Sequence, residues 1–143
     1  IRRYRACEVM LQEAGGDCIN ACLEQEFNRQ TYQVEIERLL RQYPQADGLF
    51  STDLIALNAM KLLNTHGVNV PDAFSIVGYD GVEISSLCTP ALTHVRQPLQ
   101  QLADVCVQTL VRKMQGESLT KNVILEDVEL VRGGTTRPMA DPV

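Results

Sequence analysis

An acidic residue, Asp80, follows directly after the apolar sequence Ser-Ile-Val-Gly-Tyr, at the point where a predicted strand ends. Open α/β sheets bind ligands beyond the carboxyl ends of their strands, so this carboxylate is well placed for binding. It could accept two hydrogen bonds from neighbouring hydroxyl groups, each contributing about 1.5–3 kcal/mol. An aspartate before a glycine, here Gly81, is also typical of a plain turn, and the residues alone leave both interpretations open.

Four further residues could contribute to a small-molecule site. Thr52 and Asp53 follow a second predicted strand, Gly-Leu-Phe, where Asp53 is alternatively a plain helix N-cap. The guanidinium of Arg3, with Arg2 beside it, suits vicinal hydroxyls or a carboxylate, or else belongs to a solvated basic face. Phe27 follows a third apolar run and could stack on a sugar ring or take part in ordinary packing.

The chain carries little that would support catalysis. Its only histidines, His66 and His94, come without a serine or cysteine nucleophile motif, and neither a Walker loop nor a Gly-x-Gly-x-x-Gly sequence is present. The five cysteines, at 7, 18, 22, 88 and 106, lack zinc spacing and are expected to be small buried apolar side chains. We therefore expect no catalytic residue, no metal and no cofactor, and an enzyme is the least favoured class.

Length and charge narrow the choice of function. A chain of 143 residues suits one domain, and a net charge of −5 with scattered basic residues argues that this segment does not bind nucleic acid itself. We see no signal peptide, and no apolar run approaches the roughly 18 residues needed to cross a bilayer. Because the chain opens inside a helical pattern without methionine, we expect a fragment or truncated form of a longer protein.

Helical and strand patterns alternate along the chain. Helices are predicted at 1–14, 32–43, 53–66 and 98–115, strands at 18–23, 47–51, 73–79, 92–97 and 123–131, and a tail at 135–143. Strand alternating with helix at least three times predicts a doubly wound α/β fold, with a mostly parallel sheet and helices on both faces.

Several separated motifs agree in spacing with one known family. They are Val70-Pro71-Asp72, Ser75-Ile76-Val77-Gly78-Tyr79-Asp80, Thr89-Pro90-Ala91-Leu92-Thr93, Gln97-Pro98 and Arg132-Gly133-Gly134-Thr135-Thr136. The sequence Ala-Asp-Gly-Leu-Phe-Ser-Thr-Asp at 46–53 likewise resembles that family's step from a strand into a helix. Together these motifs resemble the lactose/galactose repressor (LacI/GalR) family.

The resemblance implies a cytoplasmic, sugar-responsive transcription repressor that forms a homodimer or tetramer. An N-terminal helix-turn-helix would bind operator DNA, and a two-lobed effector domain similar to periplasmic sugar-binding proteins would hold a small sugar between its lobes. Residues 1–92 and 123–143 would form the C-terminal lobe, and residues 93–122 the crossover and a helix of the N-terminal lobe. The DNA-binding headpiece would be absent from this chain. A transport-type sugar-binding protein of the same fold is the alternative.

The resemblance also implies roles for particular residues. By motif position, Asp80 and Arg3 resemble the family's effector-binding aspartate and arginine. Phe27 falls near its stacking aromatic, and Thr52, before Asp53, stands where many members have asparagine. The residues implied in a dimer interface are Leu57, Met60, Lys61, Ile84 and Leu87.

Overall fold

The structure, a computed structural model, describes residues 2–21, 29–118, 125 and 127–138. The chain divides into two compact units, Ile1–Gln42 and Tyr43–Val143, which we describe separately. Within the described residues, none of the helices is both long and apolar enough to cross a membrane.

The first unit contains two helices, α1 (Arg2–Glu13) and α2 (Arg29–Gln42). Both helices were predicted, but the strand expected at 18–23 is wrong for residues 18–21, which are irregular, while residues 22 and 23 lie outside the described part. A strand requires a hydrogen-bonded neighbour, and the regular elements described in this unit are both helices. Residues 18–21 therefore have no ladder partner among the described residues of this unit.

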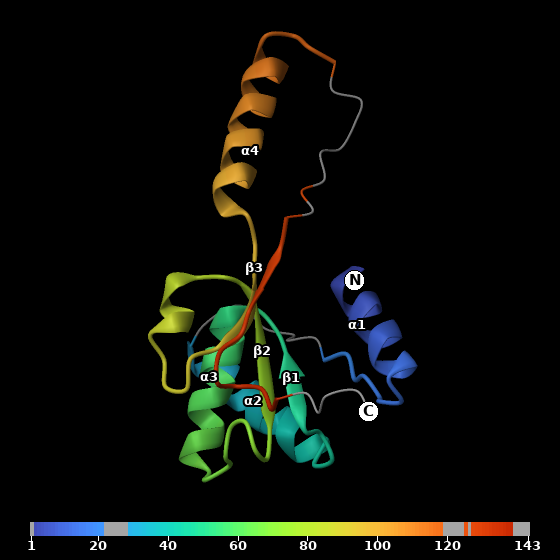
Figure 1. Cartoon of the computed structure of the whole chain (residues 1–143), viewed down its shortest axis with the longest axis vertical. Coiled ribbons are helices and arrows are strands. Elements are labelled where there is room, and N and C mark those ends of the chain that lie inside the picture. The colour runs from blue at the N-terminus through green and yellow to red at the C-terminus, as the bar shows by residue number, and fades with distance from the viewer. Residues whose placement is uncertain (1, 22–28, 119–124, 126, 139–143) are drawn as a thin grey trace. The chain divides into compact units, whose positions relative to one another are not determined.

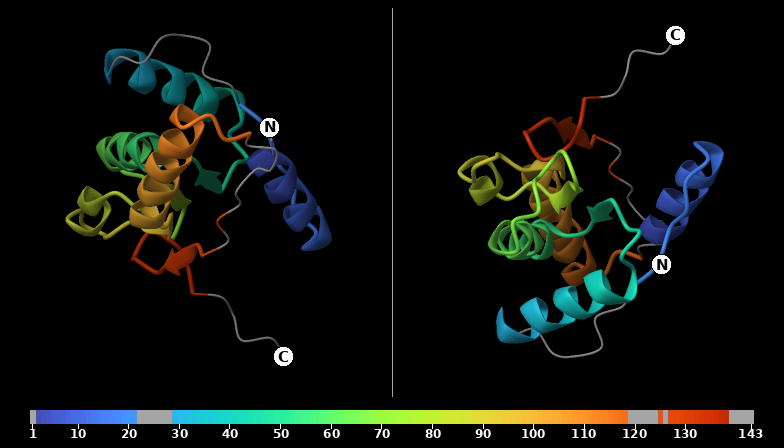
Figure 2. Two further views of the ribbon diagram at one scale, coloured as in Figure 1. Left: turned by 90° about the horizontal axis from the view of Figure 1, so that it is seen from above. Right: turned by 90° about the horizontal axis from the view of Figure 1, so that it is seen from below.

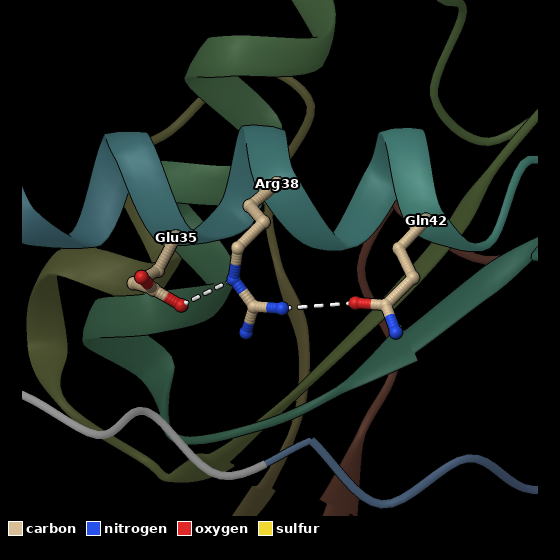
Figure 3. Close-up of polar contacts among 3 residues, drawn as sticks. All are labelled: Glu35, Arg38 and Gln42. Carbon is tan, nitrogen blue, oxygen red and sulfur yellow. Dashed lines mark hydrogen bonds and ion pairs between the residues drawn. The ribbon is translucent and has the colours of Figure 1, made fainter.

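The α2 helix has one buried and one solvated face. Tyr32 and Ile36, one helical turn apart, are its buried side chains. On the solvated face, Arg38 donates hydrogen bonds of 2.9 Å to Glu35 and of 2.9 Å to Gln42 (Figure 3). Exposed pairs at this spacing stabilise a helix by only about 0.2–0.5 kcal/mol each, so they support α2 without defining the fold.

The second unit is built on a four-stranded sheet in the order β1-β2-β3-β4 (Figure 1). Its strands are β1 (Gly48–Phe50), β2 (Ser75–Asp80), β3 (Thr93–Arg96) and β4 (Glu129–Val131). The first three run parallel, and β4 is antiparallel to β3. This arrangement confirms the predicted α/β fold with a mostly parallel sheet.

The helix α3 (Asp53–Thr65) connects β1 to β2 and packs on the sheet. Its small and aliphatic residues recur at helical spacing and form a core with the apolar residues of the sheet and its loops. The buried apolar residues of this core are Ala56, Ala59, Met60, Leu62, Leu63, Phe74, Ile76 and Leu92. Met60, implied above as an interface residue, is only 6% exposed, so its side chain packs inside this chain instead.

The segment after β4 is part of the core, and the tail predicted at 135–143 is wrong at its start. Thr135 is 0% exposed. Its hydroxyl donates to the backbone oxygen of Ile76 at 2.7 Å and accepts the backbone N–H of Thr93 at 2.9 Å. It thereby joins the beginnings of β2 and β3. Residues 139–143 lie outside the described part.

The α4 helix (Leu99–Met114) follows β3 and, although regular along its length (orange in Figure 2), has no buried residue. Its apolar face is open, with Leu110 59% and Met114 79% exposed. Cys106 on this helix is exposed as well, contrary to the expectation of buried cysteines. The apolar spacing predicted the helix correctly, and nothing within the described residues covers it.

Candidate functional site

Three polar residues stand at or just beyond the carboxyl ends of three neighbouring strands. Thr52 follows β1, Asp80 ends β2, and Gln97 follows β3. The three strands are adjacent and parallel, so their carboxyl ends meet at one edge of the sheet. This is the edge at which open α/β sheets bind ligands.

Asp80 is held in a defined orientation by Gln97. The side-chain amide of Gln97 donates to Oδ1 of Asp80 at 2.8 Å, and its backbone N–H donates to the backbone oxygen of Asp80 at 3.2 Å. Asp80 also has a positive φ of 143°, which a non-glycine residue rarely adopts and which costs on the order of 1–3 kcal/mol. No described residue donates to its second carboxylate oxygen, which is therefore open to a ligand hydroxyl.

Thr52 offers a hydroxyl at the same edge. It is the N-cap residue of α3 in an extended conformation, with φ −62° and ψ 153°, but its side chain does not cap the helix. The residue is half-buried, so its hydroxyl is partly accessible and not consumed by the helix. It can donate to one ligand oxygen and accept from another.

Asp53 takes a different role from either one that its sequence position suggested. It is 1% exposed, and its Oδ2 accepts hydrogen bonds of 2.9 Å each from the N–H of Gly81, the N–H of Val82 and the hydroxyl of Ser85. The cap of α3 is Thr52, so the expectation of an Asp53 cap is wrong. A carboxylate buried against the segment 81–85, which we name the post-strand turn, is also withdrawn from direct ligand contact.

Two glycines make this arrangement possible. At Gly78, a Cβ would fall on Oδ1 of Asp53 and 2.7 Å from Cδ2 of Leu92, so only glycine lets the carboxylate approach β2. At Gly81, φ is 82° and a Cβ would lie 2.7 Å from the Cα of Arg96. Glycine is thus needed on both sides of Asp80 in the sequence, at Gly78 for the approach of the Asp53 carboxylate and at Gly81 for the approach of Arg96.

The structure does not test two of the predicted ligand residues. Arg3 lies in α1, in the other unit, and its side chain is outside the described part. Phe27 is also outside the described residues. Their roles stay predictions.

The residues implied in a dimer interface differ in their solvent exposure. Ile84 and Leu87 are 57% and 77% exposed, Lys61 is exposed and Leu57 is half-buried. Ile84 belongs to η1 (Glu83–Ser86), and Leu87 follows this element directly. Apolar side chains this open on a short helical segment are available for contact with another surface.

Two residues of the site escaped the sequence analysis. Gln97 was seen only as part of a motif, and Ser85 was not considered. The available signal for Gln97 was its place directly after a predicted strand, the same criterion that selected Asp80. Ser85 gave no such signal, because its carboxylate partner is 32 residues away in the sequence.

The site offers hydrogen bonds rather than reactive groups. A carboxylate, a carboxamide and a hydroxyl meet at one edge, a set suited to a neutral ligand rich in hydroxyl groups. Within the described residues, the His, Cys, Asp and Glu side chains form no group of three or more that could hold a metal ion. His94 is 3% exposed and its Nδ1 is bound to the backbone oxygen of Leu92 at 2.9 Å, so it belongs to the core.

The sequence of this chain is similar to those of known proteins. Residues 1–136 match the family described as periplasmic binding protein-like domain. The ribose operon repressor of Halalkalibacterium halodurans is 30% identical over 118 residues, which are 82% of this chain and 35% of that protein.

Two solved structures share the fold. The transcription regulator CcpA of Lactococcus lactis matches with a TM-score of 0.76 and 27% identity, over 92% of this chain and 48% of that chain. A LacI family transcriptional regulator from Arthrobacter sp. FB24, in complex with lactose, matches with a TM-score of 0.74 and 25% identity, over 93% and 50%. The chain thus spans about a third of the curated relative and about half of each solved structure.

Proposed function

The chain belongs to the periplasmic binding protein-like domain family as represented in LacI-type transcription regulators, and from this membership we propose that it is the effector-binding part of a sugar-responsive repressor. The observation that carries the proposal is Asp80, whose carboxylate is oriented by Gln97 at the carboxyl edge of the sheet with one oxygen open. A carboxylate oxygen of this kind accepts a hydrogen bond from a sugar hydroxyl.

Two of the proposed ligand contacts come from strand ends. Asp80 accepts hydroxyl hydrogens and Thr52 donates or accepts beside it. Arg3 and Phe27 are proposed to add a guanidinium fork and a stacking ring. The relatives support a sugar as ligand, because one controls a ribose operon by name and another was solved with lactose.

We further propose that α4 belongs to a second lobe. Residues 1–92 and 123–143 form one lobe, and residues 93–122 cross to the other, which supplies the opposite wall of the site. The open apolar face of α4 supports this division, because exposed aliphatic side chains of this size lose about 1.5–3 kcal/mol each relative to burial. The relatives also extend well beyond the part that this chain matches.

Operator binding is proposed to reside in a helix-turn-helix outside this chain, since the net charge of −5 does not suit a phosphate backbone. The working assembly is a cytoplasmic homodimer or tetramer, with Ile84, Leu87, Leu57 and Lys61 at a two-fold contact. Sugar bound between the lobes favours one degree of lobe closure and so changes operator affinity.

The test uses the regulator that carries this chain, its second lobe and its headpiece. Operator affinity is measured with and without ribose, lactose and cellobiose, and sugar affinity is measured by calorimetry. Asp80→Asn is expected to weaken sugar binding about tenfold or more, because it removes a charged acceptor. Asp72→Asn, which makes the same change at an exposed turn residue, serves as the control.

The proposal fails if Asp80→Asn binds sugar as tightly as the unmodified protein. Sugar binding without any operator affinity would instead favour a transport-type sugar-binding protein.

A further inference from the structure

The carboxylate of Asp53 is a buried charged group that is not among the proposed contacts with the effector. It is 1% exposed, and it is far in sequence from all three of its donors, which lie 28, 29 and 32 residues later. A buried carboxylate is costly unless it is hydrogen-bonded. Oδ2 meets this requirement with three donors, whereas Oδ1 is buried with no hydrogen-bond partner among the described residues.

The donors to Asp53 identify what it holds in place. Gly81 and Val82 are the two residues directly after Asp80, and both direct their backbone N–H groups at the same oxygen. Ser85, which is 0% exposed, adds its hydroxyl from the end of the post-strand turn. One carboxylate therefore fixes the backbone from the first residue after Asp80 to the fifth.

We call the three hydrogen bonds that Oδ2 of Asp53 accepts from Gly81, Val82 and Ser85 the brace. The brace fixes the backbone that determines where the Asp80 side chain points. Asp80 has a φ of 143°, a conformation that a non-glycine residue keeps only where its surroundings hold it, whereas Gly81 adopts its φ of 82° without strain. Gln97, the residue after β3, contacts Asp80 from one side, and Asp53 holds the chain that follows Asp80 through the N–H groups of Gly81 and Val82. If the brace is released, the post-strand turn can relax, and the carboxylate of Asp80 is no longer held at the sheet edge.

The approach of Asp53 to the strand also depends on Gly78. A Cβ at that position would occupy the place of Oδ1 of Asp53. Gly78 thus leaves room beside β2 for the Asp53 carboxylate. This carboxylate, at the start of α3, accepts the hydrogen bonds of the post-strand turn.

We propose that Asp53 is a positioning residue for effector binding: it holds the post-strand turn through Gly81, Val82 and Ser85 so that Asp80 presents its free oxygen to the ligand. This inference rests on the proposed function, because it requires Asp80 to contact the effector. It assigns to Asp53 no contact with the ligand itself.

The experiment compares variants of the two-lobed regulator that carries this chain, with ribose, lactose and cellobiose as probes. Asp53→Ala removes the brace, and Asp53→Asn keeps one acceptor oxygen for the turn. Affinity is measured at a temperature where each variant is folded by circular dichroism. We expect Asp53→Ala to weaken sugar binding about tenfold and Asp53→Asn to restore most of the loss, since a hydrogen bond to a neutral acceptor is weaker but has the same geometry.

Hydrogen exchange at individual amides distinguishes a positioning role of Asp53 from a general contribution to the stability of the fold. Amide hydrogen exchange is followed at Gly81 and Val82, and at Ile76 in the middle of the sheet as the internal reference. Asp53→Ala is expected to lose protection at the two turn amides while Ile76 stays protected. Uniform loss of protection, with unchanged sugar affinity of the folded fraction, would overturn the proposal by assigning Asp53 a purely structural role.

Ser85→Ala covers the case in which Asp53→Ala does not fold. It removes one donor and leaves the carboxylate in place, so we expect a two- to fivefold loss of affinity and faster exchange at Gly81 and Val82. Unchanged affinity and exchange in this variant would count against the proposal.

Asp80→Asn, measured in parallel, distinguishes the two ways of failing. If Asp80→Asn loses sugar binding but folded Asp53→Ala binds normally, the positioning role is wrong and the proposed function stands. If Asp80→Asn binds sugar normally, the proposed function is wrong and the positioning role falls with it.

Discussion

The side-chain amide of Gln97 donates a hydrogen bond of 2.8 Å to Oδ1 of Asp80, and it ties the residue after β3 to the last residue of β2. The contact orients one carboxylate oxygen and leaves the other open. Both residues are half-buried, so this bond is less screened than one at the surface.

Gln97→Ala is expected to weaken sugar binding by about three- to tenfold in the two-lobed regulator, because Asp80 loses the group that orients it. The free energy of unfolding is expected to change little, since neither side chain is fully buried. Calorimetric titration with the sugar that binds the unmodified protein measures the effect. Gln45→Ala, at an exposed turn, is the control, and equal affinities for the two variants would contradict the orienting role.

Gly78→Ala is expected to destabilise the fold by about 1–3 kcal/mol, because the added methyl group would overlap Asp53 and lie 2.7 Å from Leu92. The matched variant is Gly48→Ala on β1, where the Cβ would lie at an ordinary 3.4 Å from the backbone oxygen of Ser75. This control is expected to stay within about 0.5 kcal/mol of the parent. Urea unfolding measures both, and a similar cost for the two would argue against the close approach.

Thr135→Val is expected to lower the free energy of unfolding by about 1–3 kcal/mol, since it removes a buried hydroxyl that serves Ile76 and Thr93 at once. Thr136→Val, which removes a single 3.0 Å contact with the Thr93 hydroxyl at a half-buried position, should cost about 1 kcal/mol or less. Denaturant titration gives the two values. If Thr135→Val lowers the free energy of unfolding no more than Thr136→Val does, the hydroxyl of Thr135 does not join β2 and β3 as we describe.

The hydrogen bond from Tyr4 to Glu8, at 2.7 Å, raises the pKa of Tyr4 to about 12, with burial adding to the effect. The folded state thus favours the neutral phenol. The stabilisation from this contact is complete below pH 10.0, the ordinary pKa, and is lost as the pH rises toward about 12.

The tyrosinate absorbance of the parent minus that of Tyr4→Phe isolates the titration of Tyr4 in a chain of four tyrosines. We expect its midpoint to fall toward 10.0 in Glu8→Gln, because the carboxylate acceptor is gone. A midpoint unaffected by this substitution would show that Glu8 is not the cause.

Leu110→Lys on α4 is expected to leave the free energy of unfolding of this 143-residue chain unchanged within about 0.5 kcal/mol, because the side chain is 59% exposed. In the two-lobed regulator it should cost about 2 kcal/mol or more, since we propose that the leucine is packed within the second lobe there. Gln108→Lys on the same helix controls for added charge. Equal effects of both variants in the two-lobed protein would contradict the assignment of α4 to that lobe.

Sequence periodicity was sufficient for most of the regular structure. The stripes at 53–66 and 98–115 became α3 and α4, and the apolar runs around Ile76 and Val95 became β2 and β3. These patterns are local, since a helix face or a strand can be recognised from residues a few positions apart. The strand prediction failed at residues 18–21 because a strand also needs a neighbour, which no local pattern guarantees.

The candidate site was predicted in part for the same reason. Asp80 and Thr52 were selected because each stands where a strand ends, and that position can be read from the sequence. Asp53 was predicted to cap a helix, because helix starts favour aspartate, or to bind the ligand, because it follows a strand; neither pattern indicated that its carboxylate is buried. Met60 was placed on a surface from its family position, whereas its burial depends on the core of this chain.

The sequence by itself determined the order of helices and strands in the second unit, the mostly parallel sheet, and the position of Asp80 at the carboxyl edge of that sheet, because each follows from short-range spacing. Only the tertiary structure decided which distant groups form hydrogen bonds, including the one that orients that aspartate. Gln97 reaches it across 17 residues, Asp53 reaches Ser85 across 32, and Thr135 reaches Ile76 across 59. Such partners meet because adjacent strands bring distant segments together, and their hydrogen bonds have no signature in either segment alone.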